Sequence, residues 1–224
     1  VLTWSKTKPG IKSKAVFECG GIGARWPKSI AAELQQHLIA FPMFGSALLD
    51  GAPQAYHCVA SHGGKIRKFK GKGVEPDQLK TMTLGSPGLV GVRSLRRLAE
   101  AKVVWIVEGI SDLLALYSAM PEDLPHVVLT AGACSYHPRP EWLQHFAGKI
   151  VVVCFDCDKP GQTGAAIWCS QLVSLAGTTV RRLVLPYTVE ENHGKDLRDY
   201  LTDGHAYADL WALAEACEPL AADD

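Results

Sequence analysis

Short apolar runs alternate with amphipathic stretches from residue 103 onward. The runs at Val103–Val107, 150–155 and 180–185 have the length and β-branched content of buried strands. A run at 127–129 predicts one more strand between the first two. Because helical stretches separate these runs, we expect parallel strands with helices on both faces, which is an α/β fold.

The helical stretches have recognisable limits. We expect one helix at 111–120, a short one at 140–146, and a longer one at 161–175 with Gly177 as its stop signal. A last helix is predicted at 207–217.

The first 100 residues have a different pattern, which predicts a smaller α+β subdomain. Residues 31–39 are a candidate helix, and 38–41 lead from it into a strand. Ala55–Ala60 and 65–69 are expected to be antiparallel strands joined by a glycine-containing turn at 61–64.

The charge balance of the chain also changes near residue 100. Residues 1–100 carry 15 Lys and Arg against 6 Asp and Glu, whereas 101–224 carry 8 against 17. The net charge of zero therefore hides a basic part beside an acidic part, although two solvated surfaces of uneven composition are the alternative. We expect a basic α+β subdomain at 1–100, an α/β domain at 101–205, and a helix with an acidic tail at 206–224.

Basic residues crowd one predicted strand of the subdomain and its exit. Such a surface can hold nucleic-acid phosphates, with binding that weakens steeply as the salt concentration rises. The alternative is a solvated strand edge whose lysines discourage aggregation. The candidates are Lys65, Arg67, Lys68, Lys70 and Lys72.

The seven cysteines are scattered, which suits a reducing compartment where thiols fill the core. Cys154 and Cys157 form a C-x-x-C without a partner pair, so no structural zinc is expected. No run of eighteen apolar residues and no signal-peptide pattern is present, so nothing in the sequence argues for a membrane or secreted protein, and a removed leader stays open. We expect a cytoplasmic location, and the initial Val1 indicates a piece of a longer protein.

Carboxylates follow three of the predicted strands. Glu108 ends the first apolar run, the pair Asp156 and Asp158 ends the second, and Asp196 follows the last. Two carboxylates about 4 Å apart repel by roughly 4 kcal/mol at an effective dielectric of about 20. A cluster of them at the carboxyl edge of a sheet must take up protons or bind a cation. Residues two apart in an extended chain point the same way, and their oxygens suit Mg²⁺ or Mn²⁺.

Each acid also has a plainer explanation. Asp156 and Asp158 could be ordinary turn residues after a strand. Asp112 could be a helix N-terminal acid that interacts with the helix dipole, and for Asp199 that explanation is preferred. Gly109, directly after Glu108, would permit a close backbone approach beside the acids.

Three segments in one order resemble the motifs of a TOPRIM domain. They are Val-Glu-Gly-Ile-Ser-Asp at 107–112, Cys-Phe-Asp-Cys-Asp-Lys-Pro-Gly at 154–161, and Lys-Asp-Leu-Arg-Asp-Tyr-Leu at 195–201. More narrowly, they resemble the catalytic core of DnaG-type primases of bacteria and phages. The resemblance covers about residues 100–205 and implies a site for two Mg²⁺ or Mn²⁺ ions. The acids it implies as metal ligands are Glu108, Asp156, Asp158 and Asp196, the first three of them catalytic.

Two upstream segments extend the resemblance to the basic part of such primases. Residues 38–45 resemble the strand that opens the primase basic subdomain, and 80–87 resemble the lysine-containing segment before the TOPRIM domain. The second likeness implies that Lys80 lies near the active site and binds nucleotide or nucleic acid.

The resemblance implies a primase-like enzyme, a DNA-directed RNA polymerase that makes RNA primers on single-stranded DNA from nucleoside triphosphates. A replicative helicase is an expected partner through regions outside this chain, and the source would be a bacterium or a phage. Two other functions stay open. A TOPRIM-type nuclease would use the same acids to activate water, and a non-catalytic nucleic-acid-binding module would keep the fold without the activity.

Overall fold

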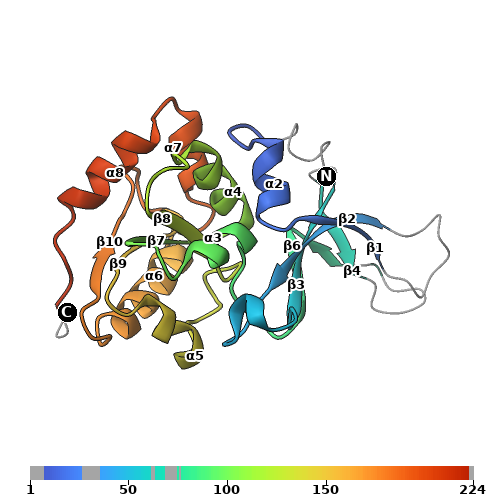
Figure 1. The fold of residues 1–224 in the computed structure, drawn as a ribbon. Helices are drawn as coiled ribbons and strands as arrows, with labels where there is room; N and C mark the ends of the chain where they lie inside the picture. The colour runs from blue at the N-terminus through green and yellow to red at the C-terminus, as the bar shows by residue number, and fades with distance from the viewer. Residues whose placement is uncertain (1–7, 27–35, 62–63, 69–74, 76, 222–224) are drawn as a thin grey trace.

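A parallel sheet organises the larger part of the molecule (Figure 1). The computed structural model describes residues 8–26, 36–61, 64–68, 75 and 77–221. The four strands of this sheet lie in the order β10-β9-β7-β8 and are all parallel. Their bounds are Val103–Val107 for β7, His126–Thr130 for β8, Ile150–Cys154 for β9 and Thr179–Arg182 for β10. The parallel sheet expected from the apolar runs is therefore confirmed.

Side chains alternate between the two faces of β7, and each face has its own core. Val103, Trp105 and Val107 pack against helices on one face, whereas Val104 and Ile106 pack against helices on the other. The first face is covered by α2 (Ser13–Glu18), α4 (Ile110–Ala119), α7 (Leu197–Thr202) and α8 (Tyr207–Ala216). The second is covered by α3 (Val92–Arg97), α5 (Pro140–Leu143) with the 3₁₀ turn η3 (Gln144–Phe146), and α6 (Lys159–Leu172).

The connections create a switch point between β7 and β9. The chain leaves β7 for β8 on one side, and then crosses to β9 on the other side of β7. Val107 pairs with Cys154 at the carboxyl ends of these two central strands. Ligand sites of open α/β sheets lie in the crevice at such a point. The sequence places Glu108 and Asp156 there, one and two residues beyond that pair.

The smaller part contains an antiparallel sheet in the order β1-β2-β3-β6, drawn in blue to teal in Figure 1. Its strands are β1 (Ile22–Trp26), β2 (Gln36–Met43), β3 (Ala55–Ala60) and β6 (Thr81–Gly85), and the 3₁₀ turn η2 (Leu48–Asp50) lies between β2 and β3. A separate pair, β4 (Ile66–Lys68) with β5 (Asp77–Leu79), places Ile66 among buried residues of this sheet. Ile39, Phe41 and Val59 belong instead to the core that includes one face of the parallel sheet.

Two predictions for the first 100 residues are wrong. Residues 36–39 of the predicted helix at 31–39 lie in β2, because β2 pairs with both β1 and β3; residues 31–35 lie outside the described residues. Ala55–Ala60 and 65–69 do not form a hairpin. β3 pairs with β2 and β6, whereas β4 pairs with β5, and the Gln36 side chain bonds to both backbone groups of Arg67.

Several predicted ends shift by a few residues. The strand predicted at 150–155 ends at Cys154, and that predicted at 180–185 ends at Arg182. The helix predicted at 161–175 begins at Lys159, since the Asp158 carboxylate caps its N-terminus, and it ends at Leu172. Among the helices in the described part of the chain, none combines the length and apolar content needed to cross a lipid bilayer.

Short backbone contacts join the two parts. Phe44 pairs with Leu89, and Val90 pairs with Thr130 at the end of β8. Gly132 (φ +98°) follows, and a Cβ added there would lie 2.8 Å from Nδ1 of the buried His57 on β3. Because α2 and α3 also pack against the parallel sheet, the elements before and after residue 100 share their cores. The domain limits at 100 and 205 stay a prediction.

A buried polar cluster anchors α8 to the sheet. Trp105 Nε1 donates to the Tyr207 hydroxyl (3.2 Å), which also pairs with Nδ1 of His126 (2.5 Å). Arg181 of β10 donates to the carbonyl of Glu215 near the end of the helix (2.8 Å). The two bonds to the Tyr207 hydroxyl are buried and satisfy polar groups that water cannot reach, so they contribute to the stability of the fold.

We expect Tyr207→Phe to lower the free energy of unfolding by about 1–3 kcal/mol, because it leaves Trp105 and His126 without a buried partner. Thermal and urea unfolding followed by circular dichroism measure this. Tyr187→Phe is the matched control, since its hydroxyl bonds to Asp203 at the surface, and it should stay within about 0.5 kcal/mol of wild type. Equal losses in the two variants would contradict the anchoring role.

Candidate functional site

A pocket of about 230 Å³ opens at the carboxyl edge of β7 and β9, between the two parts of the molecule. Its acidic side carries Glu108, Asp112, Asp156 and Asp196, and its other side includes Val59, Ala60 and Thr81 of the smaller sheet. Lys8 and Lys80 also line it. The structure therefore brings carboxylates of all three acidic motifs to one pocket, as their positions after the strands predicted.

Glu108 and the segment after β9 are in direct contact. The backbone N–H of Asp156 donates to Oε2 of Glu108 (3.3 Å). A Cβ at Gly161 would lie 2.8 Å from that same oxygen and 2.6 Å from the Asp156 carbonyl oxygen, so only glycine fits there. Burial raises the pKa of Glu108, and the neighbouring Asp158 adds to this rise. Thr130 on β8 donates to the Glu108 carbonyl (2.7 Å) and supports the motif from the other side.

The carboxylates of Asp156 and Asp158 lie in different environments. Asp156 lines the pocket, and burial together with the charges of Asp112 and Glu108 raises its pKa to about 9. Asp158 accepts from the backbone amides of Gly161 (2.8 Å) and Gly194 (3.3 Å), and it is not among the described residues that line the pocket. The chain bends at Cys157. The extended geometry that would point both carboxylates one way is therefore absent between these two residues.

Asp112 lines the pocket and does more than occupy the first turn of α4. Its carboxylate accepts from the backbone N–H of Gly109 (3.2 Å) and from that of Arg198 (3.4 Å), which joins the first motif to the third. It is buried, and burial with the charge of Asp196 raises its pKa to about 8. Gly109 lines the pocket beside it, and a Cβ there would lie 3.2 Å from Oδ2 of Asp112; a close backbone approach at Gly109 stays a prediction.

Asp196 and Asp199 share the start of α7 but differ in their exposure to the pocket. Asp196 Oδ1 accepts from the backbone N–H of Asp199 (2.7 Å), and Asp199 Oδ2 accepts in return from that of Asp196 (3.1 Å). Asp196 also pairs with Arg198 (3.4 Å) and lines the pocket, and burial raises its pKa. Asp199 fills the helix-capping role that the sequence favoured for it.

The basic candidates separate into two groups. Lys80 lies at the pocket, where its charge lowers the pKa values of Glu108, Asp156 and Asp196 against the larger effect of burial. Lys8 was missed by the sequence analysis. Burial, Arg198 and Lys80 lower its pKa, and its position before the first described helix gave no periodic or motif signal.

The remaining basic candidates lie on or beside β4, or outside the described chain. Lys65, Arg67 and Lys68 are exposed, and none is among the described residues that line the pocket. Lys70 and Lys72 lie outside the described residues. Of the four predicted basic residues that the structure describes, only Lys80 lines the pocket with the acids, and the role of the others stays a prediction.

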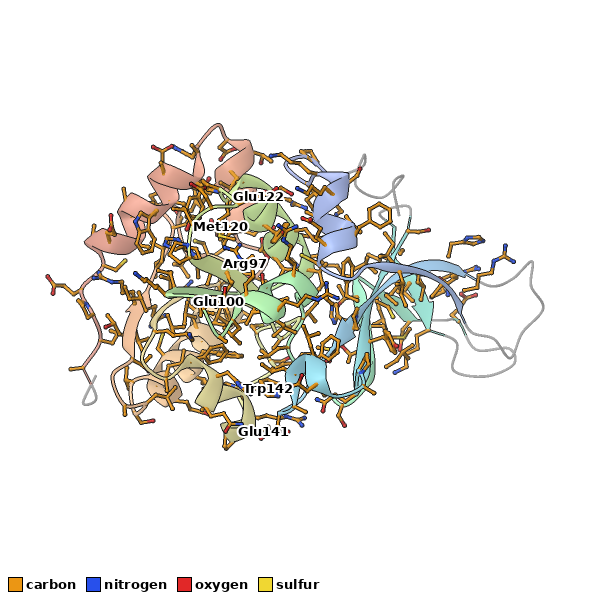
Figure 2. The ribbon with its side chains drawn as sticks, in the orientation of Figure 1. Arg97, Glu100, Met120, Glu122, Glu141 and Trp142 are labelled. Carbon is orange, nitrogen blue, oxygen red and sulfur yellow. The ribbon has the colours of Figure 1, made fainter. Side chains whose placement is uncertain are left out.

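A second hollow, of about 330 Å³, shows what a compensated charge cluster looks like in this molecule. Met120 and Glu122, just beyond the end of α4, are among the residues that line it; both side chains are labelled in Figure 2. There Glu122 pairs with Lys14, and Glu18 pairs with Arg93. In the first pocket, burial and repulsion between neighbouring acids instead raise the pKa values of Asp112 and Asp156. The acids there are therefore not neutralised by cationic side chains to the same degree.

Uncompensated carboxylate oxygens fit a hard divalent cation in charge and in donor chemistry. Within the ranges that the structure describes, however, no three His, Cys, Asp or Glu side chains are arranged to hold a metal ion. The carboxylates of Asp158 and Asp196 are engaged by backbone amides. The donor chemistry of these side chains therefore suits Mg²⁺ or Mn²⁺, whereas their arrangement in the described residues does not form a metal site.

The sequence of residues 105–201 matches the family model described as Toprim-like, and this match includes the acids of all three motifs. Residues 105–201 are a Toprim-like domain. The resemblance inferred from the motifs is thus confirmed. A comparison of the whole sequence with curated proteins found no match.

Solved primase structures share the fold of the Toprim-like domain and of the smaller part. The zinc-binding and RNA polymerase domains of the Aquifex aeolicus primase align with a TM-score of 0.58 and 18% identity, over 92% of this chain and 46% of that one. A DnaG primase catalytic domain bound to single-stranded DNA gives 0.61 and 13%, over 94% and 71%. The primase fragment of the bacteriophage T7 primase-helicase gives 0.53 and 15%, over 90% and 70%.

These likenesses establish the fold. The chain spans about half, 46%, of the Aquifex aeolicus fragment and about 70% of the other two. The expected architecture, a TOPRIM-like parallel sheet with a smaller subdomain before it, is confirmed.

We expect Asp156→Asn to stabilise the metal-free protein at pH 8 by about 1–3 kcal/mol. The unfolded carboxyl group ionises near pH 4, whereas burial and its acidic neighbours raise the folded pKa to about 9. Between about pH 4 and pH 9 the Asp156 carboxyl group takes up a proton when the chain folds, so the wild-type protein loses stability as the pH rises through this range. Asn does not titrate, so its advantage should disappear near pH 4.

Urea unfolding in EDTA at several pH values measures the effect. Asp123→Asn is the control, because Asp123 is exposed and lies outside the acidic cluster. A pH-independent difference between Asp156→Asn and wild type would show that no charge repulsion is relieved.

Proposed function

We propose that this chain is the RNA-polymerising core of a primase-like protein, which makes RNA primers on single-stranded DNA by metal-dependent nucleotidyl transfer. One observation carries the proposal. Acids from three motifs and two lysines line a single pocket between the Toprim-like domain and the smaller sheet. The likeness of the fold to a primase domain bound to single-stranded DNA supports it.

Glu108, Asp156, Asp158 and Asp196 would hold Mg²⁺ or Mn²⁺ in this proposal. Bound ions supply neutralisation of the triphosphate charge and activation of the attacking hydroxyl. The chain itself mainly positions its reactants, which is most of what a protein contributes to this type of reaction.

Lys8 and Lys80 would bind phosphate oxygens of the incoming nucleotide. Both line the pocket, so their ammonium groups would face the negative oxygens of a triphosphate bound there together with the ions. Lysine suits this task as a compact charge on a flexible stem. The exposed Lys65, Arg67 and Lys68 would hold the phosphates of the template outside the pocket. Lys70, Lys72, a helicase partner, and the cytoplasmic bacterial or phage setting stay predictions.

Alanine at Asp156 or Glu108 should lower primer synthesis at least about 100-fold, because each removes a negative group that the reaction needs at the pocket. The assay measures labelled RNA oligomers made on single-stranded DNA with Mg²⁺ or Mn²⁺. Asp123→Ala should keep wild-type activity, since this aspartate is exposed and remote from the acids.

The products separate primer synthesis from the other functions. Shortened template without RNA oligomers would favour the nuclease. Equal binding of DNA with and without Mg²⁺, and no product of either kind, would favour the non-catalytic binding module.

Lys8→Ala and Lys80→Ala should each raise the KM for nucleoside triphosphates about 10-fold or more, since each removes a charged donor worth about 1.5–3 kcal/mol. Initial rates over a range of nucleotide concentrations measure this. Lys159→Ala is the control, because Lys159 pairs with Glu191 and is not among the described lining residues. An unchanged KM in both variants would show that neither lysine binds the nucleotide.

A further inference from the structure

The main chain of Asp156 connects two of the acidic motifs. Its N–H donates to Glu108 Oε2 (3.3 Å), and its carbonyl oxygen accepts from Nε2 of Gln162 (3.0 Å). Gln162 Nε2 also lies 3.5 Å from the carbonyl oxygen of Phe155. Both backbone groups of Asp156 are therefore held, one by an acid of the pocket and the other by an amide from α6.

Arg182, the last residue of β10, holds the Gln162 side chain in turn. Its Nη2 donates to Oε1 of Gln162 (3.0 Å) and to the Gln162 carbonyl oxygen (2.9 Å). A guanidinium group can only donate, so it fixes which end of the Gln162 amide faces Asp156. The Arg182 Nε is buried and has no hydrogen-bond partner within the described residues. The guanidinium group therefore bonds to Gln162 while its buried Nε–H is left without a partner, which costs free energy of folding.

Hydrogen bonds therefore connect Arg182 of β10, Gln162 of α6 and Asp156 in the segment after β9, which lines the pocket. We infer that Gln162 and Arg182 are positioning residues that orient the Asp156 segment for divalent metal binding, an inference that rests on the proposed function. The segment bends directly after Asp156, so the direction of the carboxylate depends on how its peptide is held. Partners that orient metal ligands typically change metal affinity about 10–100-fold when they are removed.

The test uses Mn²⁺ as the probe and the whole chain, with no nucleotide or DNA. Gln162→Leu keeps much of the side-chain volume but removes both amide bonds, and Arg182→Met removes the guanidinium group that orients the amide. Electron paramagnetic resonance of free Mn²⁺ gives Kd, and thermal unfolding reports the folded fraction. We expect Kd to rise about 10-fold in Gln162→Leu and to rise by less in Arg182→Met.

Thr163→Ala is the matched control. Thr163 follows Gln162 on α6, is exposed, and donates to the Lys159 carbonyl, so its loss should leave Kd at the wild-type value. The double variant of Gln162 and Arg182 should match Gln162→Leu alone, because Arg182 acts through Gln162. Additive effects would overturn the inference.

A purely structural role predicts a different result. It would lower the melting temperature of Gln162→Leu and Arg182→Met but leave the Mn²⁺ Kd of the folded fraction unchanged, which overturns the inference. If Asp156→Ala loses Mn²⁺ binding while both positioning variants keep it, the inference fails and the proposed function stands. If the wild-type chain binds no Mn²⁺, both fail.

Discussion

Repulsion between buried carboxylates is the constraint around which this structure is arranged. Glu108, Asp112, Asp156 and Asp196 line one pocket, and burial raises the pKa of each. Backbone amides and hydrogen-bonded partners hold them there although their charges oppose it. The fold therefore keeps these carboxylates together at this edge of the sheet against their mutual repulsion.

The smaller sheet completes the pocket from the other side. Backbone pairs between Phe44 and Leu89, and between Val90 and Thr130, bring it against the end of β8. This places Thr81 and the exposed Lys80 beside the acids. The Toprim-like domain supplies the negative side of the pocket, and the part before it supplies Lys8 and Lys80. Neither part forms the described pocket without the other.

The sequence predicted those features that depend on local pattern. The run Val103–Val107 is apolar throughout because helices cover both faces of β7. This pattern was enough to predict the strand, the parallel sheet and the position of Glu108 at the end of the strand. Features that depend on long-range contacts were missed. The partners of β3 and β4 are chosen by packing across the sheet, as Ile66 shows. Asp158 caps α6 because the chain bends at Cys157, and Lys8 reaches the pocket from a segment without a pattern.

Gly132 allows the two parts of the molecule to approach closely beside the pocket. It lines the pocket at positive φ, with the His57 ring so close that even one added carbon would collide with it. A single methyl group at 132 would thus act as a spacer that separates the lysine side from the carboxylate side. A substitution here would change the spacing of the two parts beside the pocket without altering any charged group.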